Sequence, residues 1–552
     1  MLKRIVKGVI LCFAVCWAVI IFTGYWYHNP GYYGTIKHFQ YYDLLVAIGL
    51  IGGLLSWWVT GYTKKKKNWK YFNGFSLLLA FVLADLFIVS LFYSKAIPGV
   101  LSITGLFMQL GYLLFISACT FSVFLVCYSL GQTIFNFIQP TIKASERPLI
   151  EIALGFMGFI FLLFLLGTFG LLKGIILVPL MVTILGIDGK KTLQLLRDIF
   201  LRPIPINSHL NAIGIYSSLG LGLLILLNFI HILRISPTGF DAMTLYVKLA
   251  NLIHDHEGLV AGYQPYYWSL LMSVGLVAFQ KIEVVLSLSG LGGLLSLYAL
   301  FHLSRRWLDI NFTFLVLVLF YSAPLVHFQA ALDIKTDLGL LFFLLCLLIL
   351  FFNWMTVPKP VQAQQKEPHE SLESIAKFPA LLSKYTPDLL KENKLIALMG
   401  LFAGFALGIK LTALIAFLSL IIILWYVSAN KLGFATAFCL VLFGILFLRL
   451  DDVQLLRQYH LGATQLQWAL LLAGLGGLFT LWQRDSIKLF KTLQYSILLG
   501  SFFLLPVLPW LVKNYSETKM LSTTGLLNGA QANPRPNIDE LERKWKEVYL
   551  RE

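Results

Sequence analysis

Apolar runs of about twenty residues recur from one end of this sequence to the other, and they constrain its fold more than any other feature. Of the 552 residues, 58% are hydrophobic and 13% are charged, whereas about a quarter of the residues in an ordinary globular protein are charged. Only a bilayer accommodates so much apolar surface. The composition therefore excludes a soluble globular fold and predicts an all-α polytopic membrane protein.

Counting the apolar runs predicts a bundle of about 15 transmembrane helices joined by outer-face loops. The runs lie at about residues 5–25, 42–60, 71–94, 105–135, 148–169, 171–187, 211–234, 283–304, 311–328, 338–357, 395–409, 412–428, 432–449, 467–483 and 489–511. A further run at 265–279 is short for a span and begins with aromatic residues that favour the headgroup level. We expect it to lie on the membrane or to dip into it, as an interfacial helix.

Lysine and arginine gather in loops that the span count places on one side of the membrane. These loops contain Lys3 and Arg4, Lys64 to Lys67, Lys143 and Arg147, the segment from Lys190 to Arg202, and Arg305 with Arg306. Positive loops face the cytoplasm, so we expect a cytoplasmic N-terminus, a cytoplasmic loop at 358–394 and an outer-face segment after Arg234. The net charge of +16 then reflects topology and contact with membrane lipids, not nucleic-acid binding.

Two glycine repeats, Gly290–Gly293 and Gly474–Gly477, fall inside predicted spans. This position predicts close helix packing and not a phosphate-binding loop. The six cysteines lie in apolar runs without the spacing of a metal site. The sequence has no Walker motif, HExxH pair, CxxC pair or GxSxG elbow, which disfavours hydrolases and pumps built on those motifs.

Asp241 lies just outside the seventh predicted span, at the start of a helical pattern. Charged groups beside a membrane core are costly and call for a partner or a role. A carboxylate here is a candidate general base for an acceptor hydroxyl or amine, or a candidate ligand of a divalent cation. Capping of an interfacial helix is an equally good interpretation.

Asp333 and Asp337 lie between the ninth and tenth predicted spans, on the same predicted face as Asp241. Because they are four residues apart, a helix would place both on one face and turn Lys335 away. Paired acids suit an acid–base role or a metal site. Helix capping is the alternative, and it is stronger for Asp337, which opens the tenth span, than for Asp333.

Cationic and amide side chains complete the predicted outer face. Lys410 interrupts two apolar runs, and its point charge is suited to holding a phosphate. A snorkelling lysine is the commoner alternative, but a lone outer-face lysine runs against the positive-inside trend. Lys513 and Asn514 close the last predicted span and face the same way.

Four segments appear in an order that resembles the type C (GT-C) glycosyltransferases, the polyprenyl-phosphate-sugar-dependent enzymes that include the protein mannosyltransferases and the lipid A aminoarabinose transferase. The segments are Phe240–Tyr246, Leu332–Leu338, Gly404–Thr412 and Pro509–Asn514. The resemblance covers residues 211–515 as a GT-C-like catalytic module. Residues 1–210 form a separate N-terminal module of about six spans, and 516–552 form a polar tail. Because the family pattern usually continues further, the resemblance also implies a truncated chain or a completing partner.

By this resemblance, Asp241 matches the acid that activates the acceptor, and Asp333 or Asp337 matches the acid near the donor. Lys410 matches a lysine that contacts the lipid phosphate, joined by Lys513 and Asn514. The aromatic residues Tyr246, Tyr263, Tyr267 and Trp268 are candidates for a substrate loop, because sugars stack on such rings. No motif in the sequence requires a cofactor. A divalent cation (Mg²⁺ or Mn²⁺) held by the three aspartates is an alternative that the sequence leaves open.

The resemblance implies transfer of a sugar from a polyprenyl-phosphate donor to a protein, lipid or glycan acceptor at the outer face of the cell (inner) membrane. Two other classes stay open: a transporter or flippase of a lipid-linked glycan, with an intramembrane charge such as Asp85, and a noncatalytic scaffold. A transferase requires the predicted aspartates and Lys410 to converge within roughly 10–15 Å around one cavity.

Overall fold

The computed structural model describes residues 71–72, 103–187, 189, 194, 196–197, 204–205, 210–231, 241–260, 266–331, 333–356, 378–447 and 463–518. Within them the chain is helical apart from its loops and one two-residue antiparallel pairing of Tyr71–Phe72 (β1) with Ile204–Pro205 (β2). The predicted all-α class is confirmed. The predicted spans at 5–25 and 42–60, and the part of 71–94 beyond Phe72, lie outside the described residues.

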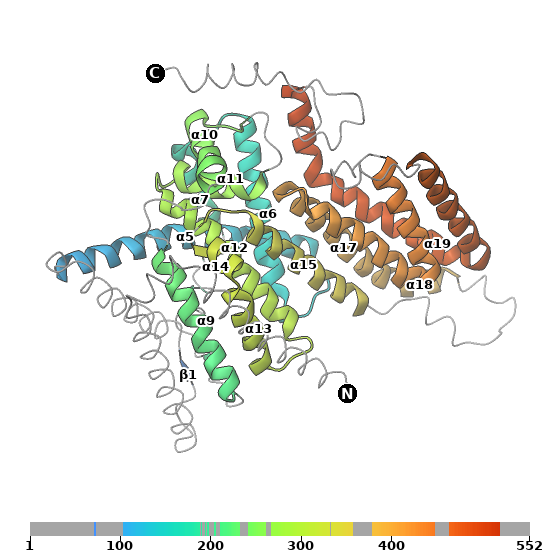
Figure 1. The fold of residues 1–552 in the computed structure, drawn as a ribbon, viewed down its shortest axis with the longest axis horizontal. Helices are drawn as coiled ribbons and strands as arrows, with labels where there is room; N and C mark the ends of the chain where they lie inside the picture. Colours follow the sequence, from blue (N-terminus) through green and yellow to red (C-terminus); the bar gives the residue numbers. More distant parts are fainter. Residues whose placement is uncertain are drawn as a thin grey trace. The chain divides into compact units, whose positions relative to one another are not determined.

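The described helices follow one another in chain order, and the α-helices are labelled in Figure 1. They are α5 (Ile103–Ile138), α6 (Arg147–Thr168), α7 (Gly174–Ile187), α9 (Ala212–His231), the π-helix η1 (Ala242–Val247), α10 (Lys248–His256), α11 (Tyr267–Val277), α12 (Ile282–Ser304), α13 (Ile310–Ser322), α14 (Pro324–Ala331), α15 (Asp337–Thr356), α17 (Phe378–Ile409), α18 (Ala413–Phe447) and α19 (Ala463–Thr518).

Seven of the described helices are long and apolar enough to cross a membrane, or eight if the bent pair α13 and α14 counts as one span. They are α5, α6, α12, α15, α17, α18 and α19. Helix α7, which the sequence predicts as a span, has only 14 residues and is about 21 Å long. The described helices are those of a membrane protein, and the predicted total of about 15 spans is not confirmed.

Two of these helices contain a break where the sequence predicts a turn between two spans. In α18 the backbone leaves helical geometry at Asn430, which has a φ of 60°, between the predicted spans 412–428 and 432–449. In α19 the break is at Asp485, with a φ of −161°. Helix α19 then continues through Pro509, so that proline does not end it.

The described helices form two compact units. The first contains α5 to α17 and ends at Lys410, and the second contains α18 and α19. In the second unit, α18 and α19 lie side by side (Figure 1). Phe417 and Phe503 stack between them, with their ring centroids 3.7 Å apart. The predicted module boundaries at residues 210 and 515 concern function, and they stay predictions.

Small residues set the distance between helices of the first unit. A Cβ atom on Gly292 of α12 would lie 2.7 Å from the backbone nitrogen of Gly339 in α15, and one on Gly290 would lie 2.6 Å from the carbonyl oxygen of Ala330. Only glycine permits these approaches, because a real Cβ would overlap the neighbouring backbone. In the second unit, a Cβ atom on Gly477 would lie 2.3 Å from the side-chain hydroxyl of Thr436 in α18. The prediction that the glycine repeats pack helices is confirmed.

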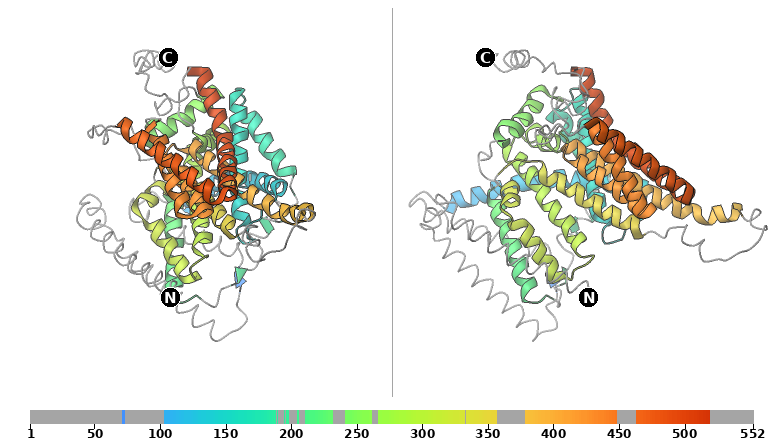
Figure 2. Two further views of the ribbon diagram at one scale, coloured as in Figure 1. Left: turned by 90° about the vertical axis from the view of Figure 1, so that its right-hand side faces the viewer. Right: turned by 45° about the vertical axis from the view of Figure 1, so that its right-hand side comes forward.

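Helices α13 and α14 form one element with a bend of 74° between them. Ala323, at the bend, has a ψ of 126°, the extended geometry that the following Pro324 favours. Helix α9 runs beside α13, as both views in Figure 2 show. After the bend, α14 packs against α12, and residues 333–336, just before α15, are not helical.

Helix α11 is buried, although the sequence predicts an interfacial helix. It has 11 residues, about 16 Å, and is too short to span a membrane. Tyr267 and Trp268 are fully buried, and their rings fill the space left by two glycines, Tyr267 against Gly408 and Trp268 against Gly339. The Tyr267 ring also stacks on Phe405, with centroids 4.8 Å apart. The aromatic residues therefore join helices of the first unit, and their level in the membrane stays a prediction.

A buried ion pair joins three segments at the C-terminal end of α15. Arg306, which follows α12, donates to both carboxylate oxygens of Glu146, which precedes α6, over 2.8 and 2.6 Å. Asn353 of α15 donates to the same carboxylate over 2.7 Å. Only 9% and 3% of the Arg306 and Glu146 side chains are exposed. This contact places Arg306 beside the loop that contains Lys143, as the span count predicts.

Candidate functional site

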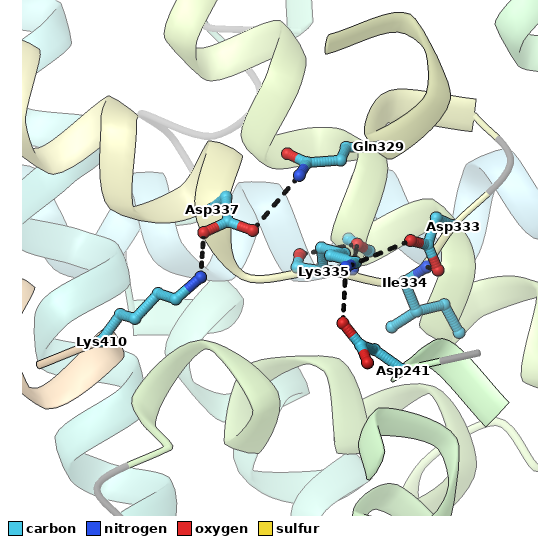
Figure 3. A network of polar contacts seen from close by, with 8 residues as sticks. Asp241, Gln329, Asp333, Ile334, Lys335, Asp337 and Lys410 are labelled. Atoms are coloured by element: carbon cyan, nitrogen blue, oxygen red, sulfur yellow. Dashed lines mark hydrogen bonds and ion pairs between the residues drawn. The ribbon is translucent and has the colours of Figure 1, made fainter. Parts of the chain in front are cut away.

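Asp241 stands at the start of η1, a single π-helical turn that continues into α10. Its side chain makes no capping hydrogen bond to that turn, so the capping interpretation is wrong. Instead Asp241 Oδ2 accepts a hydrogen bond of 2.7 Å from Lys335 Nζ (Figure 3). The side chain is 54% exposed. π-helical turns are often found at functional sites, and this one presents a carboxylate that is accessible to solvent and oriented by an ammonium.

Residues 333–336 are not helical: α14 ends at Ala331 and α15 begins at Asp337. The expectation that Asp333 and Asp337 share one helical face, with Lys335 turned away, is therefore wrong. The reason lies in the backbone of Lys335, whose N–H donates to Ser289 Oγ of α12 over 3.0 Å and whose carbonyl accepts from the same hydroxyl over 3.0 Å. These bonds to another helix replace the bonds that a continuous helix would make.

Lys335 joins two of the predicted acids. Its Nζ lies 2.7 Å from Asp241 Oδ2 and 3.8 Å from Asp333 Oδ2, and Figure 3 shows its side chain between them. Asp333 is almost completely buried and accepts a hydrogen bond of 3.0 Å from the Ile334 N–H. Tyr246 of η1 is close enough to interact electrostatically with Lys335. The predicted residues Asp241, Asp333 and Tyr246 therefore meet around one lysine.

The two charged groups in this loop have shifted pKa values. Burial raises the pKa of the Asp333 carboxyl above its usual value, and the Lys335 ammonium and the Ile334 N–H only partly offset this. The hydrogen bond to Asp241 raises the pKa of Lys335, because a carboxylate stabilises the protonated amine. Lys335 therefore remains a cation at neutral pH, between an accessible carboxylate and a buried one.

Asp337 makes a second ion pair two residues further on. Its Oδ1 accepts a hydrogen bond from Lys410, which follows the last residue of α17, and its Oδ2 accepts one of 3.3 Å from Gln329 Nε2 in α14 (Figure 3). Asp337 does open α15, as predicted. A carboxylate in the first turn of a helix and an ammonium at the end of another are each favoured by the helix dipole. The pair therefore links complementary ends of α15 and α17.

Two of the aromatic candidates for a substrate loop are unsuitable in this structure. The rings of Tyr267 and Trp268 are packed in the core on Gly408 and Gly339, where a sugar cannot reach them. Tyr263 lies outside the described residues. Tyr246 is the candidate that the structure places beside the polar site.

Lys513 and Asn514 belong to the second unit, near the end of α19. Both side chains are buried within the structure, and Lys513 Nζ lies 5.5 Å from the centroid of the Trp510 ring. An ammonium at this distance from an indole ring is held by a cation–π interaction. Their predicted role beside Lys410 at the donor phosphate stays a prediction.

The predicted aspartates do not form a metal site in the observed arrangement. Among the described residues, no group of three His, Cys, Asp or Glu side chains is placed to hold a metal ion. Lys335 lies between Asp241 and Asp333, and Asp337 is directed to Lys410. An ammonium takes the oxygen atoms that a divalent cation would need, so these residues do not fit a Mg²⁺ or Mn²⁺ site.

The structure adds Lys335, Gln329 and Ser289 to the residues that the sequence singles out. The sequence could have indicated Lys335. In an extended segment, side chains two residues apart point to the same side, and Lys335 is two residues from Asp333. Gln329 and Ser289 have no such signal. Each looks like an ordinary polar residue in an apolar run, and only the packing of α14 and α12 brings them to the charged loop.

The chain matches no protein-family model, no curated protein and no solved structure. The likeness to the GT-C glycosyltransferases therefore rests on the four sequence segments alone. Any function must be argued from the chemistry of the five charged residues that meet at this site: Asp241, Asp333, Lys335, Asp337 and Lys410.

Proposed function

We propose that this protein is a membrane glycosyltransferase that moves a sugar from a polyprenyl-phosphate donor to an acceptor. One observation carries the proposal: carboxylates and ammonium groups from η1, the 333–337 loop and the end of α17 gather in two adjoining ion pairs, within a unit made of apolar helices of membrane-spanning length. Sugar transfer from a phosphate needs both kinds of group, a base for the acceptor and a cation for the leaving phosphate.

The reaction can be written with these residues. The acceptor oxygen or nitrogen attacks the anomeric carbon, and the bond from that carbon to the phosphate oxygen breaks with its electron pair going to the phosphate. The acceptor proton passes to Asp241, and Lys410 stabilises the negative charge on the departing polyprenyl phosphate. Lys335 is a positioning residue, because its hydrogen bond to Oδ2 fixes the Asp241 carboxylate. The other carboxylate oxygen of Asp241 then receives the proton.

A lipid-linked donor explains why such a site belongs on a membrane protein. The polyprenyl chain is held by the bilayer and the sugar phosphate by water, so the reacting bond lies where both meet. The start of α15 at Asp337 supports this position, because α15 is long and apolar enough to cross a membrane. We place the site on the outer face of the cell (inner) membrane, as positive-inside counting favours.

Asp241→Asn tests the proposal. The purified protein in proteoliposomes is given a labelled polyprenyl-phosphate sugar and candidate acceptors, and we expect transfer to fall by about 10²–10⁴-fold, the usual contribution of a general base. Glu257→Gln is the matched control, because Glu257 is also a half-exposed carboxylate paired with a lysine, Lys173, in the same unit. Near-normal transfer by the Asn variant, or equal loss in the control, would refute the role of Asp241.

A transporter or flippase of a lipid-linked glycan is the second candidate, and the 74° bend between α13 and α14 favours it. Broken helices next to charged residues are typical of transporter binding sites, and Gln329 of α14 contacts Asp337. A flippase would move an intact fluorescent lipid-linked sugar between leaflets without cleaving it. Appearance of the unchanged donor in the opposite leaflet, with no transferred sugar, would decide for this candidate.

A further inference from the structure

Asp337 is poorly arranged to act on a substrate. Both of its carboxylate oxygens already have donors, Lys410 at Oδ1 and Gln329 at Oδ2. Asp241, in contrast, accepts through Oδ2 alone among the contacts the structure shows for its side chain. The sequence groups Asp337 with the catalytic acids, but the geometry indicates a carboxylate whose function is to hold Lys410.

The pair between Asp337 and Lys410 is nevertheless able to open. The exposed fractions of the two side chains are 31% and 40%, and ion pairs exposed to this extent are weak because water competes for both charges. Each partner also keeps a favourable position when the pair separates. Asp337 stays in the first turn of α15, and Lys410 stays at the C-terminal end of α17, where helix dipoles favour their respective charges.

We propose that Asp337 is a placeholder anion, which occupies Lys410 until the donor phosphate takes its place, and that Gln329 then holds the released carboxylate. This inference rests on the proposed function, because it assumes that Lys410 receives a phosphate. The donor phosphate is a diester with one negative charge and two free oxygens, and it competes with the Asp337 carboxylate for Lys410. The polyprenyl phosphate that departs is a monoester, which carries more negative charge than a carboxylate and offers three oxygens, so it displaces Asp337 more strongly. The contact from Gln329 leaves Asp337 with a hydrogen-bond donor after Lys410 has turned to the phosphate.

The proposal makes a prediction with a definite sign. Asp337→Asn removes the competitor and should make the protein bind a short-chain polyprenyl phosphate about two- to fivefold more tightly, the factor that matches a partly exposed ion pair. A residue that served catalysis or folding alone would not tighten binding when lost. Asp337→Glu keeps the competing charge and should bind nearly as the unchanged protein does.

Gln329→Leu should have the opposite effect, a weaker affinity for the same phosphate. In the bound state Asp337 would lose its remaining side-chain donor, whereas in the free state it would keep Lys410. Combining Gln329→Leu with Asp337→Asn should abolish the effect of the leucine, because no carboxylate is left to hold. This double-mutant cycle isolates the link between the two residues.

The full chain in detergent is titrated with farnesyl phosphate, with a thermal unfolding midpoint recorded for each variant to confirm folding. Asp485→Asn is the matched control, since the Asp485–Lys488 pair has exposures of 35% and 40% and belongs to the other unit. Equal or weaker affinity in Asp337→Asn, or an effect of Gln329→Leu that persists without the carboxylate, would overturn the placeholder role. If Asp337→Asn does not fold, the Gln329→Leu titration alone decides, and unchanged affinity there overturns it.

Failure of the proposed function would look different. Lys410→Met should then leave farnesyl phosphate binding unchanged, whatever residue stands at position 337. If Lys410→Met weakens binding but Asp337→Asn does not strengthen it, Lys410 keeps its phosphate role and only the placeholder inference fails.

Discussion

The two ends of helix α15 carry ion pairs of different kinds. At the C-terminal end, Glu146 and Arg306 are almost fully buried, joined by two hydrogen bonds and supported by Asn353. At the N-terminal end, Asp337 and Lys410 are partly exposed and joined by a single ammonium contact. Sixteen residues of one helix, about 24 Å, separate Asp337 from Asn353.

This difference teaches how to separate structural from functional charges in a membrane bundle. A guanidinium that binds both oxygens of a buried carboxylate has its charge balanced by that partner, and breaking such a pair leaves a buried charge. A lysine that shares a partly exposed carboxylate can exchange partners at little cost. By this criterion the Arg306 end holds the fold together, and the Lys410 end is where we propose that a substrate binds.

Cysteine labelling from one side of the membrane should give the largest difference between the two ends of α15, because one end should be labelled and the other should not. Met243→Cys lies near Asp241 and Trp307→Cys lies next to Arg306, and both native side chains are roughly half-exposed. In a background without the six native cysteines, an impermeant maleimide applied to intact cells should label position 243 and not 307. Labelling of 307 alone would invert the predicted orientation, and labelling of both would break the comparison.

Loss of the buried pair should cost the most stability. Glu146→Gln leaves the Arg306 guanidinium buried without its counter-charge, so we expect a loss of about 3–5 kcal/mol in the free energy of unfolding. Removing both charges with Glu146→Gln and Arg306→Met should recover part of this loss. Denaturant unfolding in detergent provides the measurement. A change below about 1 kcal/mol in the single variant, as for an exposed pair, would show that the two ends do not differ.

Loss of the exposed ammonium should affect binding and not stability. Lys410→Met is expected to weaken polyprenyl phosphate binding by roughly 1.5–3 kcal/mol, the range for a hydrogen bond to a charged group, and Lys410→Arg should restore part of the affinity. Fluorescence titration measures the effect, and Lys488→Met of the second unit is the control. Unchanged affinity would mean that Lys410 only snorkels to the membrane surface.

The smallest expected effect is a change in how stability depends on pH. Because burial raises the pKa of Asp333 in the folded protein, the stability that it contributes is full below its unfolded pKa and is lost as the pH rises through the folded value. Asp333→Asn should therefore gain stability over the unchanged protein as the pH rises from about 4 to 7. Lys335 does not change the pH dependence of stability in this range, because its raised pKa keeps it charged. Parallel thermal unfolding curves across this range would contradict the prediction.

Hydropathy predicted the long helices well because each one satisfies its own backbone. The predicted spans 283–304 and 338–357 agree with α12 (Ile282–Ser304) and α15 (Asp337–Thr356) to within a residue at either end. Helix α11 is different. Its aromatic residues resemble an interfacial belt, and only Gly339 and Gly408, far along the chain, make room to bury them. A hydropathy window as long as one span cannot detect a contact between residues so far apart in the sequence.

The candidate site was predictable in its residues but not in its pairing. Costly charges in an apolar chain identified Asp241, Asp333, Asp337 and Lys410, and the structure brings these residues to two adjoining ion pairs. The pairing depends on the loss of helical structure at 333–336. That loss follows from the bonds between Lys335 and Ser289, a contact 46 residues apart in sequence that no local pattern reveals.

The burial of α11 also sets an order of assembly during synthesis. Helix α11 leaves the ribosome before α12, α15 and α17, yet its tyrosine and tryptophan rings find their places only on Gly339 of α15 and Gly408 of α17. Helix α11 is too short to cross the bilayer alone, so its packing is complete only after those later helices have been made. Lys410 lies two residues after Gly408, so the entry of α17 that completes the packing of α11 also brings in the last charge of the site. The catalytic chemistry proposed for this protein is therefore absent from every nascent chain that has not yet completed its first unit.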